Sequence, residues 1–268
     1  MDVVELRDFY ARPLGALVRR LVSRRIREHW GSVAGLNTFG LGYATPYLGA
    51  FRNEAARLGA LMPGHIGGIC WPREGPLSSV LVDEDALPLP DGSVDRLLVV
   101  HSLEFSERVR PTLREIWRVL APEGRILFIV PNRRSIWARL DSTPFGHGRP
   151  YSRAQLLRLL DEALFTVVAT STSLHVPPMQ LALMLGPAPA WERAGRRLWP
   201  AFSGLILVEA RKEMMAPVGK GARAVLVPQL SPERLGRSRI ETIRCGLVGD
   251  GSGEVLHRDE APGTVTPR

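Results

Sequence analysis

Apolar and polar positions along the chain repeat with two alternating periods. Residues 4–29 place apolar side chains on one recurring helical face, and Pro13 divides this segment into two helices. Later segments switch between short apolar runs and amphipathic stretches of helical period. Strands that alternate with helices in this way predict an α/β fold built on a parallel sheet.

Seven short runs have the length and composition of strands: 36–41, 65–70, 78–82, 93–102, 125–130, 165–174 and 203–212. Helical periodicity is found in 45–62, around 113–120 and in 152–165. Ser152 and Gln155 have the spacing of a capping box at the start of the last helix. These elements fill the chain as far as residue 212.

The chain changes character near Met214. The residues that follow are rich in Gly, Pro, Ser and Arg and have no sustained period, which predicts a disordered tail over 213–268 with one weak strand near 224–227.

We therefore expect an N-terminal helical cap over 1–35 and one main domain over 36–212. Within that domain, the Met- and Trp-containing insertion 175–203 suits a helical lid or a contact between two copies of the chain.

Composition narrows the class of protein. A chain of 268 residues, 45% of them hydrophobic, can bury one good-sized core. Two cysteines are too few for a disulfide framework or a cysteine zinc site, so we expect no metal and a reducing, cytoplasmic compartment. No stretch approaches the roughly 20 apolar residues that would span a bilayer.

The net charge of +8 comes almost entirely from arginine. The densest cluster lies on the first helical segment and consists of Arg19, Arg20, Arg24, Arg25 and Arg27. We interpret it as a solvated helix face in preference to a nucleic-acid or membrane patch.

A series of motifs between Val82 and Asn132 resembles the class I S-adenosylmethionine-dependent methyltransferases, most closely the type-11 group that includes quinone-biosynthesis enzymes. The matching positions are Asp83, Leu87-Pro88-Leu89, Ser93-Val94-Asp95, Leu103-Glu104-Phe105, Leu113-Arg114-Glu115, Arg118-Val119-Leu120, Pro122-Glu123-Gly124 and Pro131-Asn132. A weaker resemblance extends over 36–212.

The resemblance implies a Rossmann-like sheet of seven mostly parallel strands with helices on both faces and an antiparallel last strand. It also implies S-adenosyl-L-methionine as the cofactor, bound in the crevice at the carboxyl ends of the strands.

Cofactor-binding roles follow from the resemblance residue by residue. The positions concerned are Gly40, Gly42, Ala44, Cys70, Trp71, Asp83, Glu84 and His101. Gly40 and Gly42 would let the backbone approach the methionine part of the cofactor, so that a side chain at Gly42 would intrude on it. Asp83 is placed to accept a hydrogen bond from the adenine amino group, and Glu84 to offer a backbone N–H.

Methyl transfer from a sulfonium requires alignment and exclusion of water rather than a fixed catalytic residue. Where the acceptor needs a base, His101 after the fourth strand lies nearest the expected methyl position. A satisfied polar group at a strand end would explain His101 equally well. Glu104 and His147 are weaker candidates for the base.

Two departures from the family pattern keep a second function open. Thr38 stands on the first strand where many relatives have an aspartate, and Cys70-Trp71 stands where the second strand is expected to end in an acidic residue. The leading hypothesis is a methyltransferase acting on a small molecule. The alternative is a catalytically silent methyltransferase-like protein that binds a partner or regulates it.

A nucleic-acid methyltransferase is a third class, supported by net charge alone. The chain lacks the N-P-P-Y or D-P-P-Y motif of base-modifying enzymes, so no nucleic-acid partner is expected.

Overall fold

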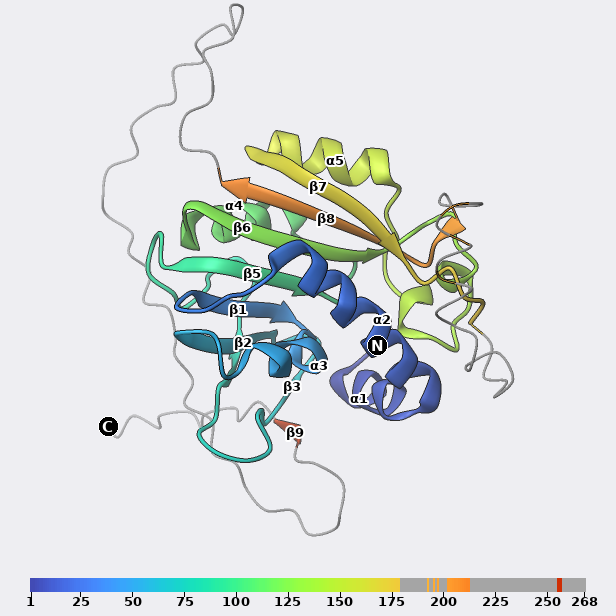
Figure 1. The fold of residues 1–268 in the computed structure, drawn as a ribbon, viewed down its shortest axis with the longest axis horizontal. Coiled ribbons are helices and arrows are strands. Elements are labelled where there is room, and N and C mark those ends of the chain that lie inside the picture. The colour runs from blue at the N-terminus through green and yellow to red at the C-terminus, as the bar shows by residue number, and fades with distance from the viewer. Residues whose placement is uncertain (179–191, 193–194, 196, 198–201, 213–254, 257–268) are drawn as a thin grey trace, which may run out of the picture.

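The structure is a computed structural model that describes residues 1–178, 192, 195, 197, 202–212 and 255–256. Its centre is a seven-stranded sheet in the order β4-β2-β1-β5-β6-β8-β7 (Figure 1). The bounds are β1 Asn37–Gly42, β2 Arg57–Pro63, β4 Ser79–Val82, β5 Val94–Val100, β6 Leu120–Pro131, β7 Phe165–Ser173 and β8 Leu205–Lys212.

The first five of these neighbouring strands run parallel, whereas β8 is antiparallel to both β6 and β7. The prediction of a mostly parallel sheet with an antiparallel last strand is therefore confirmed. A separate pair joins β3 (Gly68–Ile69) to β9 (Val255–Leu256) in antiparallel orientation.

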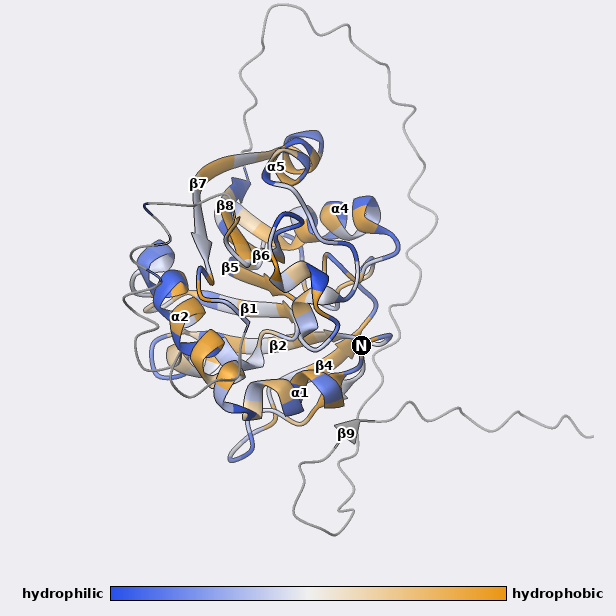
Figure 2. Cartoon of the chain, turned by 90° about the vertical axis from the view of Figure 1, so that its right-hand side faces the viewer, coloured by the Kyte–Doolittle hydropathy of each residue, from blue (hydrophilic) through white to orange (hydrophobic). Residues whose placement is uncertain are grey.

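Helices cover both faces of the sheet. The helices are α1 Val3–Ala11, α2 Pro13–Trp30, α3 Thr45–Leu48, α4 Val109–Val119 and α5 Arg153–Glu162. The first three share one apolar core with one face of the sheet, and α4 and α5 share a second core with the other face. Figure 2 shows the apolar strands enclosed between these two helical layers.

Strand β6 shows how one sequence serves both cores. Leu127 and Ile129 pack toward α1 and α2, while Ile126, Phe128 and Val130 pack toward α4 and α5. Successive side chains of a strand point to opposite faces, so a wholly apolar run is what a strand covered on both sides requires.

The N-terminal helices begin and end as the sequence predicts. Asp2 and Glu5 form a capping box at the start of α1, and Pro13 opens α2. The capping box of Ser152 and Gln155 is likewise present on α5.

The helix predicted over 45–62 is wrong. Only α3 and a 3-10 turn, Gly49–Phe51, are helical, and after a turn over 52–56 the segment becomes strand β2. Apolar residues at Leu58, Ala60, Leu61 and Met62 fit either period over so short a run, and pairing between β1 and β4 decides for the strand.

Most of the insertion 175–203 and nearly all of the tail, including the strand expected near 224–227, lie outside the described residues. Glu192 is described, and its carboxylate accepts hydrogen bonds from Ser173 Oγ and from the backbone N–H groups of Leu174 and His175. These bonds hold part of the insertion to the end of β7.

Candidate active site at the carboxyl edge of the sheet

The chain changes winding direction between β1 and β5. From β1 the strand order runs outward through β2 and β4, and from β5 it runs the other way. In open α/β sheets, ligands bind at such a point, beyond the carboxyl ends of the strands. The two strand ends are joined directly here, because the Tyr43 N–H donates to the Val100 carbonyl over 2.8 Å.

A polar pocket of about 370 Å³ opens beside this point. It lies beyond the ends of β2 and β4 and is lined by Gly64, His65, Val82, Asp83, Glu84, Asp85, Phe105, Glu107, Arg108 and Thr112. Its volume falls in the range of about 300–1,000 Å³ that is usual for small-molecule sites. We call it the donor pocket.

The carboxylates of the donor pocket differ in their surroundings. Asp85 forms an ion pair with Arg108 at the pocket rim. Glu84 accepts a hydrogen bond of 2.7 Å from the Ser102 hydroxyl. Asp83 is exposed, and its backbone forms an isolated bridge with Ala86 that shapes the turn. Asp83 therefore presents an exposed carboxylate to a ligand, as does Glu107.

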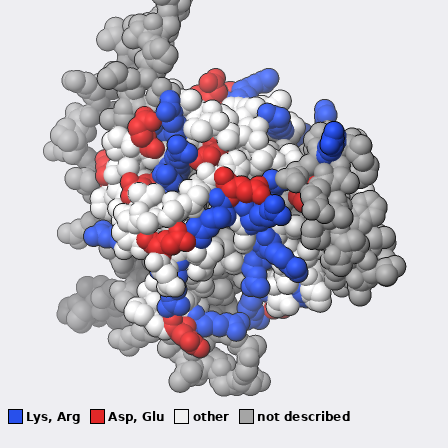
Figure 3. Space-filling view, in the orientation of Figure 1, with Lys and Arg blue, Asp and Glu red and all other residues white. Residues whose placement is uncertain are grey.

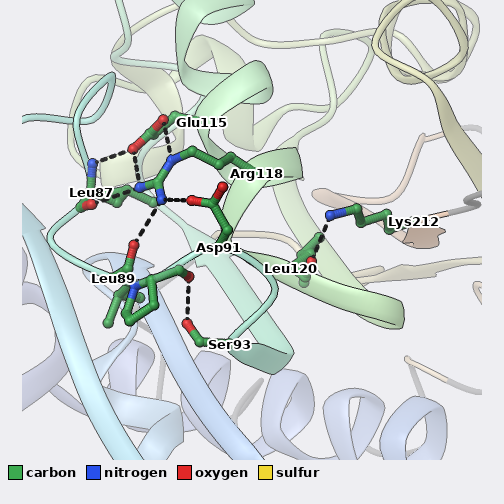
Figure 4. Close-up of polar contacts among 9 residues, drawn as sticks. Leu87, Leu89, Asp91, Ser93, Glu115, Arg118, Leu120 and Lys212 are labelled. Carbon is green, nitrogen blue, oxygen red and sulfur yellow. Dashed lines mark hydrogen bonds and ion pairs between the residues drawn. The ribbon is translucent and has the colours of Figure 1, made fainter. Parts of the chain in front are cut away.

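A charged network on α4 fixes the chain that leaves the donor pocket (Figure 4). Arg118 donates to the carbonyls of Leu87 and Leu89 and to the carboxylates of Asp91 and Glu115, and Glu115 accepts from the Leu87 N–H over 2.8 Å. These contacts raise the pKa of Arg118, chiefly through Glu115. The Glu115 and Arg118 positions of the sequence motif thus act by holding the 87–91 loop.

The glycines at the end of β1 are closely surrounded by neighbouring atoms. A Cβ at Gly42, where φ is +85°, would overlap the Val100 carbonyl oxygen and crowd Ser102, and a Cβ at Gly40 would overlap the Ala44 methyl group. Gly42 is therefore required by its close approach to the β5 backbone, and Gly40 by its packing against the Ala44 and Leu48 side chains. The expectation that a Gly42 side chain would project into cofactor space is wrong, because the space belongs to β5.

Beyond this loop, α1 covers His101. The Tyr10 hydroxyl lies 3.0 Å from His101 Nε2 and 2.8 Å from the Tyr47 hydroxyl, and all three side chains are buried. On the other side of the imidazole, Nδ1 faces Glu104 Oε1 at 3.3 Å. A carboxylate, an imidazole and a phenol thus stand in line.

Aromatic rings enclose this line of polar groups. Phe145 lies 5.2 Å from the His101 ring, and Tyr10 contacts Phe9, Tyr43 and Tyr47 at centroid separations of 5.3–6.0 Å. We call this packed cluster of side chains around His101 the His101 chamber. It shares the segment 101–105 with the donor pocket, since Ser102 bonds to Glu84 and Phe105 lines the pocket.

Burial sets the protonation of the chamber's phenols. It raises the pKa of Tyr10 well above its usual value, an effect strengthened by Tyr47, Tyr43 and the charge of Glu104. Burial and then Glu104 also raise the pKa of Tyr151 to about 12. Because Tyr10 stays protonated, its hydroxyl can donate to Nε2 while the Nδ1 side of His101 faces the carboxylate.

The residues predicted for the site fall into three groups. Asp83 and Glu84 line the donor pocket, His101 lies in the chamber, and the Gly40–Ala44 loop forms the buried base between them. Cys70 and Trp71 do not stand at the end of the second strand, because β2 ends at Pro63. They follow β3, where the Trp71 N–H donates to Ser79 Oγ.

No motif in the sequence pointed to three residues of the site. Tyr10 reaches His101 only because α1 folds back over the sheet, and nothing near it in the sequence signals that contact. His65 and Arg108 line the donor pocket. Correct placement of β2 would have revealed His65, which follows that strand directly. The weak candidate His147 lies instead beside a second pocket of about 210 Å³.

Three of the five arginines of α2 are engaged in contacts with neighbouring side chains, and Arg19 and Arg20 are exposed. Arg24 and Arg25 pair with Glu28, and Arg27 pairs with Glu54 and lies 4.4 Å over the Phe51 ring. Figure 3 shows acidic side chains among the basic ones on this face. The mixture agrees with a solvated helix face.

Comparisons with known proteins agree with this geometry. Residues 70–128 match the family model described as a methyltransferase domain. No curated protein matches the chain. In the part of the chain that the structure describes, no helix has the length and apolarity to cross a membrane.

Three solved structures are similar in fold. A SAM-dependent methyltransferase from Thermotoga maritima, described as a possible histamine N-methyltransferase, is 14% identical with a TM-score of 0.58, over 79% of this chain and 96% of that one. A putative methyltransferase of Haloferax volcanii, in complex with the Trm112 methyltransferase activator, is 18% identical with a TM-score of 0.58, over 80% and 99%. A SAM-dependent methyltransferase from Archaeoglobus fulgidus is 17% identical with a TM-score of 0.51, over 72% and 94%.

At these identities the solved structures establish only the fold. The family model in addition identifies the segment after β3, residues 70–128, as similar to a methyltransferase domain. The chain thus has the fold of S-adenosylmethionine-dependent methyltransferases, and residues 70–128 match a methyltransferase domain.

Proposed function

We propose that the protein transfers a methyl group from S-adenosylmethionine to a small-molecule acceptor. The observation that carries this proposal is the adjacency of a polar pocket and a buried imidazole–carboxylate pair at the point where the sheet winding reverses. A nucleoside-sized ligand in the pocket would direct its far end toward the segment 101–105.

The donor pocket fits the adenosine end of the methyl donor. Asp83 offers carboxylate oxygens to the adenine amino group, and Phe105 offers an apolar surface to the ring. His65, directly after β2, supplies a polar group on the side where the family pattern has an acidic residue. Bound S-adenosylmethionine would supply an electrophilic methyl group.

The chain's own residues would align the acceptor and exclude water. The His101 chamber is enclosed by aromatic rings, and His101 and Glu104 are almost completely buried. A nucleophile held at Nε2 could pass its proton to His101, and Glu104 would stabilise the resulting imidazolium. Alignment and desolvation are the main contributions that this reaction needs from a protein.

A catalytically silent, partner-binding protein is the second candidate. Thr38 is fully buried and its hydroxyl has no hydrogen-bond partner among the described residues. The second strand also ends in Pro63-Gly64 without a carboxylate. The fold itself permits other functions, since one protein of similar fold is a [4+2]-cyclase, 20% identical with a TM-score of 0.50 over 72% of this chain and 80% of that one.

Calorimetric titration with S-adenosylmethionine and S-adenosylhomocysteine separates the two candidates. We expect saturable binding of both, weakened by Asp83→Ala. Absence of binding at millimolar ligand would reject the methyltransferase proposal in favour of the silent protein.

A further inference from the structure

Tyr10 occupies the space that an acceptor would need. Its hydroxyl is the partner of His101 Nε2, and its ring is surrounded by the aromatic side chains of the chamber. The ring is buried and comes from α1, a helix outside the sheet and its loops. The structure thus displays a phenol bound at the candidate base.

The walls of the chamber suit an aromatic ring. Tyr47 and Phe9 meet the Tyr10 ring edge to face, at interplanar angles of 88° and 83°, and Tyr43 lies tilted at 30°. Such arrangements stabilise an aromatic pair by about 0.5–1.5 kcal/mol beyond simple burial. An aliphatic alcohol would gain none of these ring contacts.

Several buried polar atoms at one end of the chamber lack hydrogen-bond partners among the described residues. Among the described residues, His101 Nδ1 and both carboxylate oxygens of Glu104 have no hydrogen-bond partner, although each residue is at most 2% exposed. The 3.3 Å contact between them is close but poorly aligned. Buried carboxylates without partners are uncommon and indicate a functional role or an absent ligand.

We propose that the methyl acceptor is a phenol, which replaces Tyr10 against His101 Nε2 when α1 moves away. This inference rests on the proposed function and names the acceptor class for the same site. The phenol O–H would donate to Nε2, and its ring would lie among Tyr43, Tyr47 and Phe145.

The chemistry of the step balances at this position. The phenol oxygen loses its proton to His101 Nε2, and an oxygen electron pair forms the bond to the methyl carbon. The carbon–sulfur bond breaks with its electron pair remaining on sulfur, which becomes neutral. The imidazolium faces Glu104 until its proton passes to solvent, and the product is an aryl methyl ether.

In the first experiment the Tyr10 side chain is removed, and a free phenol is added to take its place. Tyr10→Ala removes the side chain, and binding of p-cresol and of toluene is then measured at equal millimolar concentrations by thermal unfolding. A net hydrogen bond contributes about 0.5–1.5 kcal/mol, so we expect p-cresol to bind about threefold to tenfold more tightly than toluene. His101→Phe in the Tyr10→Ala background should abolish this preference.

Phe128→Ala is the matched control, because it also removes a fully buried ring but opens its cavity toward Phe165 in the other apolar core rather than toward His101. There, p-cresol should show no advantage over toluene. Should Tyr10→Ala fail to fold, Tyr10→Val retains part of the packing and enters the same comparison.

Three results would overturn the phenol acceptor: equal affinity for p-cresol and toluene, binding of neither by the folded variant, or tighter binding of benzylamine. A titration with S-adenosylhomocysteine on the same variant keeps the proposals distinct. Binding of that ligand without a p-cresol preference rejects only the acceptor class. A p-cresol preference without binding of S-adenosylhomocysteine rejects the methyltransferase proposal and leaves only a phenol-binding site.

Discussion

The two halves of the candidate site are built in different ways. The donor pocket is open, lined by charged side chains, and formed by consecutive short segments after β2, β4 and β5. The His101 chamber is closed and aromatic, and its rings come from α1, the loop after β1 and the loop after β6. The residues of the donor pocket can therefore be recognised from motifs along the sequence. Those of the His101 chamber come together only in the folded chain.

Under the proposed function, this difference would separate recognition of the methyl donor from recognition of the acceptor. The family-like motifs cluster on the donor side, where Asp83, Glu115 and Arg118 shape the pocket and its loop. The chamber is completed by Tyr10, which no motif includes. A change of acceptor would need substitutions in α1 and leave the donor side intact.

The largest expected effect on stability is at Gly42, in the segment that joins the donor pocket to the His101 chamber. Gly42→Ala should lower the free energy of unfolding by about 2–5 kcal/mol, because a left-handed residue costs about 1–2 kcal/mol and overpacking about 1–3 kcal/mol. Denaturant unfolding followed by circular dichroism measures the change. Gly49→Ala is the control, since a Cβ there meets nothing within 4 Å and φ is −55°. Similar stability of both variants would contradict the packing of Gly42 against β5.

Within the donor pocket, two neighbouring carboxylates should differ in their effect on binding. Asp83→Ala should weaken S-adenosylhomocysteine binding by about tenfold to a hundredfold, equivalent to about 1.4–2.8 kcal/mol. Asp85→Ala should change it by less, because that carboxylate is already paired with Arg108. Calorimetry measures both affinities, and unfolding temperatures check that each variant is folded. Equal losses would show that the adenine lies elsewhere in the pocket.

The smallest effect concerns the far edge of the sheet, where α2 is attached. Glu209 contacts His29 Nδ1 at 3.1 Å and Arg125 at 3.2 Å, and His29 Nε2 lies 2.7 Å from Ser171 Oγ. Burial raises the pKa of Glu209, but the contacts with His29 and Arg125 outweigh it and leave the pKa below its usual value of 4.5.

A carboxyl whose pKa is lowered on folding stabilises the native state above its unfolded pKa. That stabilisation is lost as the pH falls from about 4.5 through the folded pKa. Wild type should therefore lose more stability than Glu209→Gln on acidification, seen as a larger fall in unfolding temperature. Parallel acid dependence of the two proteins would contradict the assignment.

How much the sequence could predict depends on the range of the interactions. Alternating apolar runs predicted the sheet. The capping residues of α1 and α5 act on neighbours three residues away, so such helix starts can also be predicted from the sequence alone. Strand β2 was missed because Arg57–Pro63 fits a helical period and becomes a strand only by pairing with two neighbours. Cys70 and Trp71 were misplaced as a direct result of that error.

Asp83 and Glu84 could be placed because a motif fixes their distance from β5. The contact of Tyr10 with His101 spans 91 residues, and it depends on how α1 crosses α2 and on which face of the sheet α2 covers. Those are properties of tertiary packing, and no local period or motif encodes them.

The crossing of α1 and α2 brings their backbones together. A Cβ at Gly15 would overlap the Phe9 carbonyl oxygen, so no side chain separates the helices at their elbow. The same two-helix unit carries Tyr10 at one edge of the sheet and His29 at the other. If α1 moves away from His101, as the proposed phenol acceptor requires, α1 and α2 would move as one unit. The rate at which a molecule reaches His101 would then depend on how often that unit opens, and weakening the contact of Tyr10 or of His29 would raise this rate.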